Sequence, residues 1–200
     1  MKNPFDTPER VAFRKTLQDF VAKEIKPTVD TWDEASEIPW DLHQRVGALG
    51  VWGFGIEEQY GGLGMDDCFM RAAYNEEFAM CGANGVPAAL NGRMISIEPI
   101  QRHAKIRSRA LPDIVSGRKG SSLGITEPSG GSDVAGMKTT AQFDSDNYVI
   151  NGSKTFITGG MTSDFFVIGA RTGDDGLAGI SLFLWMRSHP DSRAPPQTEK

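Results

Sequence analysis

The hydrophobic pattern of this 200-residue chain changes its period near residue 120, and this change constrains the fold more than any other feature. Before residue 120, apolar residues recur at helical spacing, which predicts amphipathic helices. After it, short runs of alternating and β-branched residues are separated by turn residues, which predicts strands. Because no helical stretch separates these strands, we expect an antiparallel sheet or small barrel rather than a doubly wound sheet. The pattern therefore predicts an α+β protein that begins with an all-α helical bundle.

Three segments follow from this pattern. Residues 1–120 are expected to form the helical domain and residues 121–186 the β domain. Residues 187–200 are polar and contain prolines, so we expect a disordered tail that buries no core. Helices are expected from the capping segment Asp6–Glu9 with a kink at Pro27, over 39–49, after Asp66 or Asp67, over 86–103 with a break near Pro99, and around 111–115; strands are expected over 139–143, 148–150, 153–158, 165–172 and 179–185.

Composition limits the function classes. Lys and Arg total 21 against 26 Asp and Glu, and a net charge of −5 argues against a nucleic-acid or anionic-membrane surface. No apolar run suits a spanning helix or a signal peptide, so we expect a cytoplasmic protein without a membrane span. Two cysteines, Cys68 and Cys81, provide neither a disulfide framework nor metal-ligand spacing. The histidines have no metal or triad partners at useful spacing, so no metal site is predicted.

The segment 123–134, Leu-Gly-Ile-Thr-Glu-Pro-Ser-Gly-Gly-Ser-Asp-Val, joins the two halves and carries the first candidate site. Gly130 and Gly131 have no Cβ, so a ligand can approach their backbone closely. Ser132 and neighbouring amides can donate to phosphate or carbonyl oxygens without a formal positive charge. Thr126 offers a hydroxyl suited to the edge of a heterocycle. A turn that only connects two elements is the alternative.

The segment 148–160, Tyr-Val-Ile-Asn-Gly-Ser-Lys-Thr-Phe-Ile-Thr-Gly-Gly, carries the second candidate site. An aromatic ring at Phe156 beside the hydroxyl of Thr158 can stack on a flat ligand and hydrogen bond to its edge. The alternative is a core phenylalanine at sheet alternation. Lys154 is interpreted as an exposed strand lysine rather than an anion ligand.

Together the two segments resemble the acyl-CoA dehydrogenase family. In that family a Thr-Glu-Pro-x-x-Gly-Ser-Asp segment opens the middle β domain, and an Asn-Gly-x-Lys-x-aromatic-Ile-Thr segment follows it. This chain has both segments, in the same order and at the family's spacing. The resemblance runs from about residue 5 to about residue 184 and includes the loop Tyr60–Gly64 and the helix segment Glu76–Ala79.

The resemblance implies FAD as cofactor and acyl-CoA as substrate. It places Thr126 at the flavin pyrimidine edge and Ser132 near both the FAD pyrophosphate and the substrate pantetheine. It places Phe156 beside the isoalloxazine and the Thr158 hydroxyl near flavin N5. Gly159, where the family often has asparagine, is expected to loosen the turn. The implied cofactor-binding residues are Leu123, Ile125, Thr126, Gly131, Ser132, Phe156, Ile157 and Thr158, and Ser132 is also the implied substrate-binding residue.

The implied activity is the α,β-dehydrogenation of acyl-CoA thioesters to 2-enoyl-CoA in fatty acid metabolism. An electron-transfer flavoprotein is the implied acceptor, and the family forms homo-oligomers. The family's catalytic glutamate comes from a C-terminal domain, while the resemblance stops near Leu184. We therefore expect no catalytic residue in this chain, an incomplete antiparallel β-barrel, and a truncated or frameshifted reading frame as the explanation. The alternatives are a non-catalytic flavin- or acyl-CoA-binding fragment and an oxidase or monooxygenase relative on the same fold.

Overall fold

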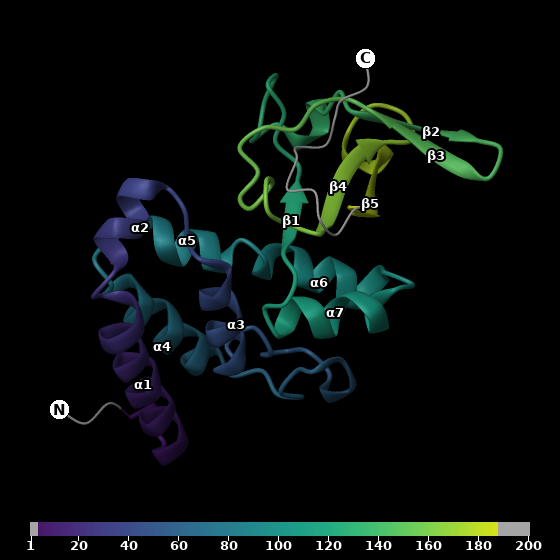
Figure 1. Ribbon diagram of the computed structural model, residues 1–200. Helices are drawn as coiled ribbons and strands as arrows, with labels where there is room; N and C mark the ends of the chain where they lie inside the picture. The colour runs from purple at the N-terminus through teal and green to yellow at the C-terminus, as the bar shows by residue number, and fades with distance from the viewer. Residues whose placement is uncertain (1–3, 188–200) are drawn as a thin grey trace. The chain divides into compact units, whose positions relative to one another are not determined.

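The computed structural model describes residues 4–187, whose contacts divide into two compact units. The first, which we call the helical unit, contains the residues up to Asn91 together with Ile106–Arg118. The second, the sheet unit, contains Gly92–Lys105 together with the residues from Lys119 on. Helices come first and strands follow, which confirms the α+β class (Figure 1). The proposed domain bounds 1–120 and 121–186 remain predictions, and the predicted tail, apart from Arg187, lies outside the described residues.

The first helices begin and bend where the sequence predicts. Thr7 caps the first helix by accepting the backbone N–H of Arg10 at 3.3 Å, and proline occupies its first turn. A π-helical turn precedes Pro27, which has no backbone N–H to continue the helix. These elements are α1 (Pro8–Phe20), the π turn (Val21–Ile25), α2 (Val29–Ala35) and α3 (Trp40–Ala48).

The later helices overlap the predicted segments, but the break between two of them lies at another position. The predicted break near Pro99 is wrong, because Pro99 lies inside the helix Met94–His103, and the interruption falls at Gly92 and Arg93, between that helix and the helix Gly85–Asn91. Glycine and proline both disfavour a helix interior, so propensity alone does not decide where the break falls. The elements are α4 (Cys68–Ala79), α5 (Gly85–Asn91), α6 (Met94–His103) and α7 (Arg107–Val115).

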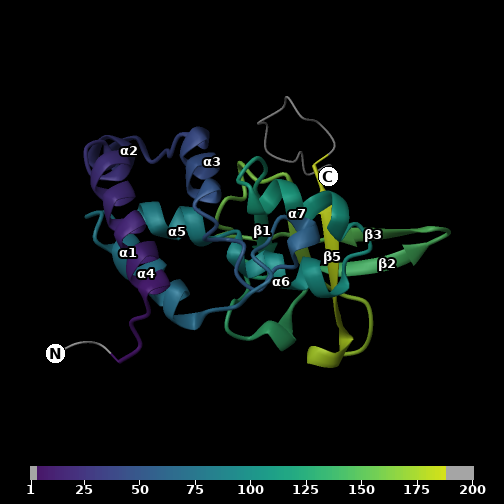
Figure 2. The ribbon, with the colours of Figure 1, turned by 90° about the horizontal axis from the view of Figure 1, so that it is seen from below.

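A buried apolar core holds the helical unit together. α1 lies beside α4, as both views show (Figures 1 and 2). Most of the fully buried side chains lie on helices, and burying each of them stabilises the unit by removing apolar area from water. They include Leu17, Val21, Ile25, Leu42, Val46, Trp52, Tyr74, Phe78, Leu90, Leu111 and Ile114.

Asp67 is the cap of α4, and its removal is expected to destabilise the helical unit. Its Oδ1 accepts the N–H groups of Phe69 and Met70 at 2.9 and 3.2 Å, and its Oδ2 pairs with Arg10 at 2.9 Å. Asp67→Ala should lower the helical unfolding midpoint by a few degrees, measured by circular dichroism at 222 nm. Asp66→Ala, which removes only an exposed pair with Arg71, is the control. Equal midpoints for the two variants would contradict the capping role.

The strands of the second unit form a mixed sheet rather than the predicted antiparallel one. β1 pairs in parallel with β4, β2 pairs antiparallel with β3, and β5 pairs antiparallel with β4. The parallel pair arises because the long connection between β1 and β4 contains the β2–β3 hairpin and returns the chain in the same direction. Within residues 4–187 the sheet stays open. Its strands are β1 (Ser121–Gly124), β2 (Thr140–Asp144), β3 (Asn147–Asn151), β4 (Phe165–Arg171) and β5 (Ile180–Met186).

Helix α6 packs on β1 and β4 of this sheet. Ser96 of α6 donates its hydroxyl to Ser121 of β1 at 2.6 Å, and both side chains are buried. The β2–β3 hairpin projects from the rest of the sheet in both views (Figures 1 and 2). None of the helices described over residues 4–187 has the length and apolar character that crossing a lipid bilayer requires.

The strand predicted over 153–158 does not form. β3 ends at Asn151, and the residues after it have irregular backbone. Phe156 has a φ of +55°, in the left-handed region, which an extended strand cannot contain. This segment is therefore a loop whose position depends on contacts other than a strand ladder.

Candidate functional site

The two motif segments lie side by side within the sheet unit. The N–H of Thr155 donates to the backbone oxygen of Thr126 at 3.0 Å. The hydroxyl of Ser122, in β1, donates to the backbone oxygen of Thr158 at 2.7 Å. Residues 122–126 and 155–158, distant in sequence, are thus joined at two points by hydrogen bonds. We call residues 123–132 the junction and residues 156–158 the tip.

A buried ion pair links the same segments. Lys154 Nζ lies 2.9 Å from Glu127 Oε1 and donates to the backbone oxygen of Ile125 at 3.0 Å. The side chains of Lys154 and Glu127 are only 12% and 5% exposed. The interpretation of Lys154 as an exposed strand lysine is therefore wrong, because the loop turns its ammonium group inward onto the junction.

The environment of Glu127 keeps its carboxylate charged. Burial alone would raise its pKa, but hydrogen bonds from Thr139, Lys154 and the backbone N–H of Lys138 outweigh burial and lower the pKa to about 2. The backbone N–H groups of Lys138 and Thr139 donate to the two carboxylate oxygens at 2.8 and 2.9 Å. A carboxylate held this way is a structural anion and a poor general base.

A tight turn presents Gly130 to solvent. Glu127 and Gly130 exchange backbone hydrogen bonds at 3.0 and 3.1 Å. A Cβ built on Gly130 would have no heavy atom within 4 Å, so the backbone there is open to an approaching group. Ser132, two residues on, is exposed. The turn therefore offers an accessible serine hydroxyl beside backbone that a ligand can approach closely.

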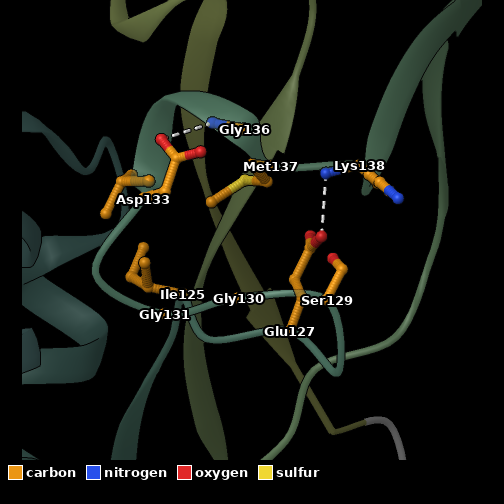
Figure 3. Close-up of a pocket in the computed structure, with 10 residues that line it drawn as sticks. Ile125, Glu127, Ser129, Gly130, Gly131, Asp133, Gly136, Met137 and Lys138 are labelled. Atoms are coloured by element: carbon orange, nitrogen blue, oxygen red, sulfur yellow. Dashed lines mark hydrogen bonds between the residues drawn. The ribbon is translucent and has the colours of Figure 1, made fainter.

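A cavity of about 180 Å³ lies between this turn and the segment that follows it (Figure 3). Its lining residues are Ile125, Glu127, Ser129, Gly130, Gly131, Asp133, Val134, Gly136, Met137 and Lys138. In Figure 3 the carboxylate of Asp133 points toward the N–H of Gly136, to which it is hydrogen bonded at 3.1 Å. Of the eight predicted cofactor residues, all within residues 4–187, this lining includes Ile125 and Gly131 and none of the others.

The tip exposes an aromatic ring. Phe156 is 92% exposed, which excludes the core interpretation. Its left-handed φ of +55° is unfavourable for a bulky side chain, and such strain is found most often where a ligand or partner binds. Thr158 is also exposed, and Ile157 is half-buried. Gly159 follows with a φ of +72°, a conformation that glycine and asparagine tolerate best.

Sequence reasoning placed some of these residues and missed others. The junction residues Leu123, Ile125 and Thr126 continue from β1 and are half-buried. The pairing of Glu127 with Lys154 was missed. The only sequence signal for it is that Lys154 is the one charged residue of segment 148–160, while segment 123–134 carries two acidic residues, Glu127 and Asp133. Whether the eight predicted residues bind a cofactor remains a prediction.

Solved structures define the class of protein to which this fold belongs. Butyryl-CoA dehydrogenase from Megasphaera elsdenii is 30% identical, with a TM-score of 0.84 over 94% of this chain and 51% of that one. A glutaryl-CoA dehydrogenase from Mycobacterium smegmatis, solved in complex with FADH2, is 28% identical, with a TM-score of 0.77 over 92% of this chain and 47% of that one. The fold is therefore that of CoA-ester dehydrogenases.

The sequence identifies the family itself. The family model described as acyl-CoA dehydrogenase, N-terminal domain, matches residues 7–118, and the one described as acyl-CoA dehydrogenase, middle domain, matches residues 122–200. An acyl-CoA dehydrogenase of Bacillus subtilis is 33% identical over 92% of this chain and 49% of the relative. The chain belongs to the acyl-CoA dehydrogenase family, a family of oxidoreductases, and spans about half the length of the curated relatives it matches.

Proposed function

We propose that the sheet unit binds FAD through the junction and the tip, and that the chain serves the α,β-dehydrogenation of an acyl-CoA thioester. The observation that carries this proposal is Phe156, an aromatic ring held almost fully exposed in a strained conformation beside the junction. An exposed, strained aromatic next to hydroxyl and amide donors matches what a flat ring with a phosphate tail requires.

The donor set at the junction fits the polar part of FAD. The exposed Ser132 offers a neutral donor to a pyrophosphate, and the open backbone at Gly130 leaves room for the ligand to approach. Formal cations are not required there, because oriented backbone N–H groups stabilise an anion. By family resemblance, the remaining contacts come from Leu123, Ile125, Thr126, Gly131, Ile157 and Thr158.

Each residue then has a binding or orienting role. FAD, when bound, supplies the acceptor for the β-hydrogen of the acyl-CoA. Phe156 covers one side of the ring and excludes water, Thr126 and Thr158 donate or accept at its edge, and Ser132 also binds the substrate. Glu127 is unsuited to remove the α-proton, because it is paired with Lys154 and its pKa is about 2.

The wider setting follows from the family. We propose an electron-transfer flavoprotein as the acceptor, homo-oligomeric assembly, a role in fatty acid metabolism, and a cytoplasmic location. The acyl chain length is not part of the proposal.

The proposal is tested by the 450 nm flavin absorbance of the purified chain. FAD is added, unbound FAD is removed by filtration, and the yellow band is expected to stay with the protein. Butyryl-CoA is then added anaerobically. Loss of the band supports dehydrogenation, and a protein that retains no flavin contradicts the proposal.

The same sample separates the alternatives. Bound flavin that is not bleached by an acyl-CoA favours a binding role without turnover. Bleached flavin whose colour returns quickly on exposure to air favours an oxidase on the same fold. Bleached flavin that recovers only with an added electron-transfer flavoprotein favours the dehydrogenase.

A further inference from the structure

We propose that the buried Glu127–Lys154 pair positions the junction and the tip relative to each other, so that one flavin can bridge them. This inference rests on the proposed function and deepens it. It assigns the pair no contact with flavin or substrate, so both are positioning residues.

Lys154 attaches the tip to the junction. Its ammonium group donates both to Glu127 Oε1 and to the backbone oxygen of Ile125, so one side chain contacts the junction at two points. The N–H of Thr155 adds a third link, to the backbone oxygen of Thr126. Phe156 follows directly, so a displacement of Lys154 carries the exposed ring with it.

Glu127 holds the turn of the junction in place. Its backbone closes the turn with Gly130, while its carboxylate accepts hydrogen bonds from two N–H groups just before β2 and from the ammonium group of Lys154. The carboxylate therefore ties three separate parts of the chain to one point. The turn that leads to Ser132 cannot move without breaking charge-assisted hydrogen bonds.

The tip depends on such contacts because no strand ladder holds it. Residues 152–158 form no strand in the described part of the chain. A buried ion pair is an inefficient way to gain stability, because removing two charges from water offsets their attraction. We therefore infer that the pair contributes more to spacing than to the free energy of unfolding. The lowered pKa of Glu127 keeps it charged at neutral and mildly acidic pH.

The test compares FAD affinity with thermal stability in four proteins: the wild type, Lys154→Met, Lys154→Arg and the double variant Glu127→Gln/Lys154→Met. Lys154→Met is expected to weaken FAD binding at least about tenfold and to lower the unfolding midpoint. Lys154→Arg, which keeps the charge, should recover most of the affinity. The double variant leaves no unpaired charge, so it should recover the midpoint but not the affinity. Lys15→Met, which breaks an exposed pair in α1, is the matched control and should bind FAD as the wild type does.

Two results would overturn the inference. One is wild-type FAD affinity in Lys154→Met. The other is a double variant that regains affinity together with stability, which would make the role of the pair purely structural.

Hydrogen exchange separates this inference from the proposed function. If the wild type binds no FAD, the proposed function fails, while the spacing role is still decided by the amide of Thr155. That amide is expected to exchange at least about tenfold faster in Lys154→Met than in the wild type, with the β4 amides as an unchanged reference. Equal exchange at Thr155 would show that the pair does not hold the two segments together.

Discussion

Replacing Phe156 with alanine is expected to weaken FAD binding about tenfold while leaving the fold intact. The ring is 92% exposed, so its removal creates no cavity. Phe156→Gly should lose the same affinity and also raise stability by about 1 kcal/mol, because glycine adopts a φ of +55° without strain. Affinity and stability thus change in opposite directions, which is typical of a residue that serves binding rather than folding.

The measurements are an FAD fluorescence titration and a thermal unfolding curve for each variant. Phe156→Trp keeps a flat aromatic surface and should bind FAD as the wild type does. Phe143→Ala, at another exposed aromatic of the sheet unit, is the matched control. Wild-type affinity in Phe156→Ala, or equal losses in Phe156→Ala and Phe143→Ala, would contradict a stacking role for the tip.

Replacing Glu127 with glutamine is expected to destabilise the sheet unit by about 2 kcal/mol at neutral pH. The change leaves the ammonium of Lys154 buried without its counter-charge. Since the pKa of Glu127 is lowered from 4.5 to about 2, its stabilising effect is fully present above pH 4.5. That effect is lost as the pH falls toward 2, so the difference between wild type and variant should narrow over this range.

The measurement is urea unfolding of both proteins at several pH values between 7 and 2.5. Other carboxylates affect both proteins alike and cancel in the difference. Glu98→Gln, in an exposed pair with Arg102, is the control and should leave the unfolding free energy nearly unchanged. A difference that is constant over the whole pH range would contradict the lowered pKa and the strength of the pair.

The helical unit was predictable because its determinants are local. Caps such as Asp67 and the apolar stripes of α1 and α4 act within a few residues of the chain. The β2–β3 hairpin was predictable for the same reason. The break at Gly92 rather than Pro99 was not, because both residues disfavour a helix and packing decides between them.

The arrangement of the sheet was less predictable. β1 and β4 lie in parallel although 40 residues separate Gly124 from Phe165, and no turn residue specifies that pairing. The loop conformation of residues 153–158 depends on the left-handed backbone at Phe156, which no rule for phenylalanine predicts. Contacts between residues that are distant in the sequence decide both features.

In the candidate site, too, some features follow from neighbouring residues and others only from the tertiary structure. From its order of residues alone, the chain could be assigned to its family, and two segments could be identified as ligand-binding candidates. Only the tertiary structure showed that Lys154 turns inward onto Glu127 and that Phe156 turns outward. Hydrophobic period and capping are properties of neighbouring residues, whereas the energy of a buried charge depends on partners that only folding brings within reach.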